Sequence, residues 1–419
     1  MRYQLTIITV LLSCISYSQE LSSEPKSRFI FTPEVMVGIT AEANENFPDH
    51  DPQFQLLANF GWEHDGNPQE WAQRLKGPRT GLTLGYANYG NADSLGSSIT
   101  AMPTIEFNIF RKERLKVLVG MGASYFTTKF DPVTNPNNQG ITTDITFSFR
   151  AFLHYQILSG KKVDWRTGVG YFHHSNGHTY LPNQGLNSFL VSLSADIKNT
   201  KKPDVGTPDF SFSRTANDYI SLRGGYGINV LSLAEVFNDP KSVYTLSGEY
   251  GKVFNNTWKI GGGAYYRFYE HYYDYIKGNE SLVQDGAEFD FFREDPWRYA
   301  TNFGIYGTGE VLLNHFGIHV QIGLNLHKPA YKIDWRINEG WDNPPRDLPP
   351  NWVFGEFNTK FKLKNAISSR MGLKYYLIGT NKQPKNNIFA SVHINSNLGQ
   401  ADFTEVSLGY VYSFNFRNR

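Results

Sequence analysis

A strict two-residue alternation of apolar and polar side chains constrains this chain more than any other feature of its sequence. From Phe316 to Leu326 every even position is apolar, whereas the odd positions carry glycine, histidine, glutamine and asparagine. Successive side chains of a strand point to opposite faces of a sheet, so this stretch is predicted to be a strand with one apolar and one polar face. The same pattern returns at residues 141–155 and 402–416.

The composition agrees with a chain built from strands and turns. The 419 residues include 31 Phe, 25 Tyr and 38 Gly, a profile that favours strands over helices. Lys and Arg number 40 and Asp and Glu number 39, which leaves a formal charge of only +1. This balance argues against a nucleic acid as the partner.

The first residues predict export. Arg2 precedes an apolar run from Leu5 to Leu12, and small residues follow at Ser16 and Ser18. This layout is typical of a secretory signal peptide, here residues 1–18, which would remove Cys14 from the mature chain. The alternative is a lipoprotein signal that keeps Cys14 as an acylated N-terminus. Beyond this segment no apolar run approaches the roughly 18 residues that a membrane helix needs.

Export without a helical anchor favours a transmembrane barrel over a soluble sandwich, because charged residues such as Asp144 and Arg150 lie on the polar face of a predicted strand. We therefore expect an all-β chain in the outer membrane of a Gram-negative bacterium. The sequence shows no internal repeat and no domain linker, so residues 19–419 are expected to form a single antiparallel β-barrel. Its strand number should be even, between 12 and 16.

Three local features refine this expectation. Asn67, Pro68 and Glu70 before the stop at Gly77-Pro78 predict one short helix near the N-terminus. Residues 54–63 and 356–365 are among the further predicted strands. The joint at 159–162 is short like a periplasmic turn, whereas 128–140, 177–186 and the Pro-rich 340–352 are long like extracellular loops.

The stretch "GVGYFHHSNGHTYLPNQGLNSF" concentrates polar residues where a predicted strand ends. On the strand 163–176, the two-residue period places His173 and Ser175 on the apolar, lipid-facing side. On the returning strand, 187–198, Asn187 also lies on the apolar side and near the same rim. The loop length places this rim at the extracellular end of the barrel.

These three residues can form a nucleophilic site. A serine needs a general base, which His173 can provide for Ser175, and the Asn187 carbonyl can orient the imidazole through its other nitrogen. The alternative is that all three are rim residues contacting lipid headgroups. A zinc site of His173, His174 and His178 is disfavoured, because neighbouring residues of a strand point to opposite faces.

The runs "HHSNG" and "PNQGLN" resemble the motif of outer-membrane lipid A 3-O-deacylases of the PagL type, also called acyloxyacyl hydrolases. The resemblance implies that His173 is the base, Ser175 the nucleophile, and Asn176 and Asn183 oxyanion donors. The family has Glu where this chain has Asn187. A second family, the outer-membrane phospholipase A, has a similar motif with Asn as the third member. Its calcium-binding positions would be His178 and Asn183 here.

From the residues and these resemblances we expect a serine esterase that removes a fatty acyl chain from lipid A by a Ser-His-Asn mechanism. Backbone amides near Gly177 would help to hold the oxyanion. The expected partner is an outer-membrane lipid, either lipopolysaccharide lipid A or a phospholipid, near the extracellular leaflet. No metal or cofactor is expected, except calcium if the phospholipase interpretation holds. A passive pore and a structural barrel remain the non-catalytic alternatives.

Overall fold

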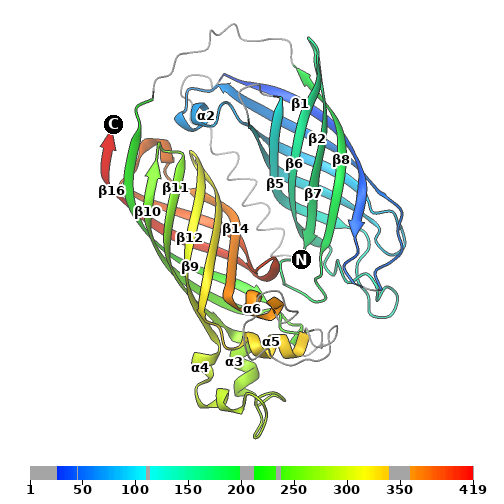
Figure 1. Ribbon diagram of the computed structural model, residues 1–419, viewed down its shortest axis with the longest axis vertical. Helices are drawn as coiled ribbons and strands as arrows, with labels where there is room; N and C mark the ends of the chain where they lie inside the picture. Colours follow the sequence, from blue (N-terminus) through cyan, green and yellow to red (C-terminus); the bar gives the residue numbers. More distant parts are fainter. Residues whose placement is uncertain are drawn as a thin grey trace.

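The computed structural model describes residues 26–44, 46–109, 114–198, 212–232, 237–338 and 359–418. In these residues sixteen strands form two closed antiparallel barrels, β1 to β8 and β9 to β16 (Figure 1). The first barrel consists of β1 Lys26–Ala41, β2 Gln53–Gly66, β3 Arg79–Asn88, β4 Ser97–Asn108, β5 Leu115–Phe126, β6 Ile145–Ser159, β7 Val163–Ser175 and β8 Leu186–Lys198. The second consists of β9 Thr215–Asn229, β10 Lys241–Phe254, β11 Trp258–Tyr269, β12 Thr301–Leu313, β13 Phe316–His327, β14 Ile367–Tyr376, β15 Asn386–Asn397 and β16 Gln400–Asn418.

The expected all-β architecture is confirmed, but the expected single barrel is wrong. Strand β1 pairs with β8, and β16 pairs with β9, so each set of eight closes on itself. Alternation reports which face of a strand each side chain occupies, and this period is the same in one large barrel and in two small ones. Which distant strand closes a barrel is therefore not visible in the local pattern.

Short helices lie in the connections. Near the N-terminus, α2 Glu70–Arg74 confirms the predicted helix, although Gln69 is its N-cap and the Asn67 side chain accepts from the Gln69 N–H. The other helical segments are α3 Glu270–Lys277, η2 Asp290–Glu294, α4 Pro296–Tyr299, α5 Tyr331–Asn338, α6 Thr359–Ala366 and η3 Thr380–Lys382. None of the helices in the described ranges is long and apolar enough to cross a membrane.

The strand expected at 356–365 is also wrong, because α6 occupies 359–366. Its "KFKLK" run alternates like a strand, but the Phe361 ring stacks on Tyr331 and meets Trp335 of α5, with centroids 5.8 and 5.2 Å apart. Tertiary packing overrides the local pattern here. The predicted signal peptide, 1–18, and the loop 340–352 lie outside the described residues.

The connections divide each barrel into two ends. In the first barrel, residues 42–44, 46–52, 89–96, 127–144 and 176–185 lie at one end, called the loop end here. The helix α2 and residues 160–162 lie at the other end, the turn end. In the second barrel α3 to α6 lie at the loop end. At the turn ends, Trp71, Ala72 and Leu75 of α2 pack with Phe107 of the first barrel and with Val311 and Leu313 of the second. The turn ends of the two barrels therefore lie next to each other.

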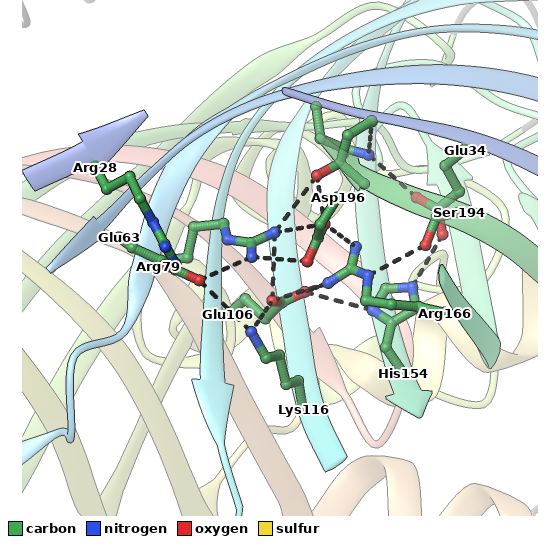
Figure 2. A network of polar contacts seen from close by, with 12 residues as sticks. Arg28, Glu34, Glu63, Arg79, Glu106, Lys116, His154, Arg166, Ser194 and Asp196 are labelled. Atoms are coloured by element: carbon green, nitrogen blue, oxygen red, sulfur yellow. Dashed lines mark hydrogen bonds and ion pairs between the residues drawn. The ribbon is translucent and has the colours of Figure 1, made fainter. Parts of the chain in front are cut away.

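The lumen of the first barrel is filled by an ionic layer and an apolar layer. Figure 2 shows the ionic layer, in which Arg166 binds Glu106, and Arg79 binds Asp196. Arg150 and Glu34, both completely buried, form another pair of this layer. Breaking such a buried pair on one side only costs about 3–5 kcal/mol, so these pairs restrict what can change inside the barrel. The apolar layer lies on the loop-end side of the ionic layer and consists of Met36, Leu57, Met102, Leu118, Phe152, Phe172 and Leu190.

Candidate active site

His173 and Asn187 face each other across the last two strands of the first barrel. They are directly opposite in the β7–β8 register, and His173 Nδ1 lies 2.8 Å from Asn187 Oδ1. An amide oxygen only accepts hydrogen bonds, so Nδ1 carries the proton and Nε2 is left with its lone pair. This tautomer is the one that a general base needs.

Tyr171 completes the environment of Asn187. Its hydroxyl donates to Asn187 Oδ1 over 2.5 Å and also lies 3.5 Å from His173 Nδ1. Tyr171 was not among the site residues predicted from the sequence, although it lies on the same strand face as His173. The signal was its position two residues before His173, because residues i and i+2 of a strand share a face.

Ser175 is the last residue of β7 and lies beside His173 under the loop 176–185. Ser175 is only 5% exposed, so surrounding protein atoms cover most of it. Gly185, with a φ of +73°, packs against both residues. A Cβ added to this glycine would lie 3.0 Å from His173 Cε1 and 3.6 Å from Ser175 Cβ. Ser175 and His173 thus both lie next to Gly185. No hydrogen bond joins Ser175 to His173 in this structure. Catalytic hydrogen bonds often tighten only when substrate is bound.

Asn176 and Asn183 organise this loop. The Asn176 side chain accepts from the N–H groups of His178 and Thr179, while its Nδ2 donates to Thr142 Oγ1 and to the Tyr180 carbonyl. This Nδ2 is therefore already engaged, which favours a scaffold role over the donor role that the resemblance implies.

The amide of Asn183 has a fixed orientation. Its Oδ1 accepts from the Asn176 N–H over 3.0 Å, so Nδ2, the other branch of the planar amide, points away from that N–H. Gly177, at a φ of +67°, forms the sharp bend between these two asparagines. The loop thus ties the Asn183 side chain to the backbone of Asn176, the residue that follows Ser175.

The three histidines considered as zinc ligands are separated by the strand geometry. His174 points into the lumen, where it is bonded to Tyr89 and Ser148. His173 lies on the outer face, and His178 lies on the loop at a φ of +69°. In the described ranges no group of three or more His, Cys, Asp or Glu residues is placed to hold a metal ion.

The surface around the site is apolar. Val169, Phe189 and Val191 share the outer face of β7 and β8 with His173 and Asn187, and each is more than half exposed. Exposed apolar side chains in a continuous band are typical of the lipid-facing surface of a transmembrane barrel. The polar site interrupts this band at the loop end.

A comparison with family models finds a match in the first barrel. Residues 53–196 match the lipid A 3-O-deacylase (PagL) family. The PagL match covers β2 to β8 and contains His173, Ser175 and Asn187, so the resemblance predicted from the motif is confirmed. It ends in β8, before the second barrel begins. Together with the barrel fold, the match indicates an outer-membrane protein.

A comparison with solved structures finds low-scoring matches to membrane proteins and to other proteins. The crystal structure of the outer-membrane enzyme PagL is 17% identical, and the alignment covers 39% of this chain and 97% of that one with a TM-score of 0.28. A de novo designed transmembrane β-barrel is 14% identical, with 42% and 100% covered and a TM-score of 0.23. CdiB from Acinetobacter baumannii is 8% identical, with 92% and 60% covered and a TM-score of 0.16. No curated protein sequence matches the chain.

Proposed function

We propose that this protein is an outer-membrane serine esterase that removes a fatty acyl chain from lipid A. The observation that carries the proposal is the 2.8 Å contact between His173 Nδ1 and Asn187 Oδ1, which prepares His173 as a base beside Ser175 on the outer face. A lumen-facing site would not meet a membrane lipid. The match to the lipid A 3-O-deacylase family supplies the reaction class.

In the proposed mechanism His173 Nε2 accepts the Ser175 proton as Oγ attacks the carbonyl carbon of an acyl ester. The tetrahedral intermediate collapses when the bond to the sugar oxygen breaks, and His173 returns the proton to that oxygen. Water, deprotonated by His173, then attacks the acyl-serine ester. This second attack releases the fatty acid and restores Ser175.

Negative charge on the carbonyl oxygen needs donors that are already in place. We assign this role to Asn183 Nδ2 and the Gly177 backbone N–H, on the loop that covers Ser175. Asn176 acts on the same loop through its four hydrogen bonds to Thr142, His178, Thr179 and Tyr180. Asn187 orients the imidazole, but an amide does not stabilise the imidazolium as a carboxylate would.

The location of the site supports an outer-leaflet substrate. The first barrel has the short 160–162 connection at its turn end and longer connections at its loop end, as in bacterial barrels whose long loops are extracellular. The site lies at the loop end. Lipid A would reach Ser175 laterally from the membrane, across the exposed side chains of Val169 and Phe189.

A phospholipase is the second candidate function, because Asn187 stands where the resemblance to the deacylases expects Glu. A passive pore fits less well, since ionic and apolar layers fill the lumen of the first barrel. Mass spectrometry of outer-membrane lipids with and without the protein distinguishes the two enzymes. Loss of one hydroxyacyl chain from lipid A supports the proposal, whereas lysophospholipid in its place selects the phospholipase. Unchanged lipids would overturn both.

A further inference from the structure

The second barrel contacts the loop that covers Ser175. Asn238, which precedes β10 and is 7% exposed, binds both backbone polar groups of Leu181. The Leu181 N–H donates to Asn238 Oδ1 and the Leu181 carbonyl accepts from Asn238 Nδ2, each over 2.8 Å. One side chain of the second barrel therefore holds one residue of the loop at two points.

Strand β16 makes a further contact with the same loop. Thr404 Oγ1 donates to the Gly177 carbonyl over 3.1 Å. A Cβ on Gly177 would lie 2.1 Å from Thr404 Oγ1, so the loop approaches the second barrel at a distance that only glycine permits. This bond holds the carbonyl of Gly177, the residue whose N–H we assign to the oxyanion.

These contacts adjoin the residues that line the site. Gly177 follows Asn176 directly, and Leu181 lies two residues before Asn183. The Asn176 N–H donates to Asn183 Oδ1. A shift of Leu181 or of Gly177 would therefore move both asparagines. Gly177, His178 and Gly185 of this loop have a positive φ, which is an uncommon conformation for His178.

We propose that the second barrel positions the oxyanion-binding loop of the first through Asn238 and Thr404. This inference rests on the proposed function. In this arrangement β9 to β16, which the family match does not include, belong to the catalytic unit. Asn238 and Thr404 are positioning residues, because they act through the loop and not on the substrate. Displacement of a reacting group by about 1 Å can lower a rate about 10²-fold.

The test compares variants of the full chain in the same detergent, normalised to folded barrel. Asn238→Ala should lower kcat by roughly 10- to 10²-fold and leave KM within about twofold, since the lipid-facing surface is unchanged. Thr404→Val should lower kcat by a smaller factor, and Thr404→Ser, which keeps the hydroxyl, should restore it. Hydrogen exchange of residues 177–184 should become faster in Asn238→Ala.

Asn387 offers a matched control at the turn end of the second barrel. Its side chain also binds both backbone groups of one residue, because Ile378 N–H donates to Oδ1 over 3.0 Å and Nδ2 donates to the Ile378 carbonyl over 2.7 Å. Asn387→Ala should therefore lose a similar pair of bonds without any change in kcat or in exchange of the loop 177–184.

The outcomes separate this inference from the proposed function. Turnover by the wild type together with an unchanged kcat in Asn238→Ala and Thr404→Val would overturn the positioning role alone. Equal losses in Asn238→Ala and Asn387→Ala would also overturn it, because they would report general stability. A wild type without turnover on lipid A or phospholipid would overturn the proposed function, and the positioning role with it.

Discussion

The two barrels have the same construction and differ at one rim. Each closes eight strands around a lumen with buried ion pairs, such as Arg166 with Glu106 in the first and Lys374 with Glu310 in the second. Each also shows exposed apolar side chains on its outer face. Architecture alone therefore does not make either barrel an enzyme.

The difference lies in the last hairpin of each barrel. In the first, β7 and β8 are joined by the loop 176–185, and His173 faces outward opposite Asn187. In the second, β15 and β16 are joined only by Leu398 and Gly399, and His393 faces inward opposite Glu405. His393 is 1% exposed and bonded to His319 in the lumen.

The histidine that lies opposite a glutamate in the strand register is thus buried in the lumen, where a lipid does not reach it, while the one bonded to an amide lies on the outer face. Two features separate the barrels: the face on which the histidine lies and the length of the loop that follows it. The first three predictions below change residues of the candidate site and use a counterpart in the second barrel as the control, and the fourth removes calcium.

Ser175→Ala should have the largest effect. Activity should fall at least about 10³-fold, because the variant lacks the attacking oxygen and keeps only binding and oxyanion stabilisation. The control is Ser396→Ala, which removes an outward-facing serine near the loop end of β15 that is bonded to Ser369. Rates of fatty-acid release from purified lipid, normalised to heat-modifiable folded protein, provide the measurement. Full turnover by Ser175→Ala would disprove the assignment of the nucleophile.

Asn187→Ala should lower the rate by a factor on the order of 10 to 10³, less than Ser175→Ala, because an unoriented base still works part of the time. Asn187→Glu should keep or raise activity where the new carboxylate is ionised, since its charge stabilises the imidazolium. Asn386→Ala, at an outward-facing asparagine of the second barrel, is the control. If Asn187→Ala matches the wild type in the same assay, the third member of the site lies elsewhere.

Tyr171→Phe should reduce the rate roughly two- to tenfold, because one neutral hydrogen bond to Asn187 is lost and contributes about 0.5–1.5 kcal/mol. Tyr410→Phe removes the same kind of bond in the second barrel, where the Tyr410 hydroxyl donates to Asn386 Oδ1 over 2.6 Å. Steady-state kinetics of both variants measure the contrast. Equal rates for Tyr171→Phe and Tyr410→Phe would exclude Tyr171 from the site.

Removal of calcium should have the smallest effect. A chelator should change the rate less than about twofold, because calcium takes six to eight oxygen ligands and no carboxylate lies between His173 and Asn187. The measurement is turnover in EDTA with and without added calcium. Recovery that depends on calcium would move the protein to the phospholipase group.

The comparison also shows which features of the site local sequence patterns can predict. Alternation around His173 and Asn187 predicted that both lie on the outer face near one rim, and the register confirms this. It could not show that Tyr171 also binds Asn187, because side-chain reach depends on strand pairing.

The sequence by itself determined the strand periods, the short helix at Glu70–Arg74 and the grouping of Ser175, His173 and Asn187 at one rim, because these follow from local backbone geometry. Only the tertiary structure decided that β1 pairs with β8 and β9 with β16, and that Asn238 of one barrel holds Leu181 of the other. Such contacts join residues far apart in the chain. Their free energy depends on register, closure and packing, and a two-residue period carries no record of these.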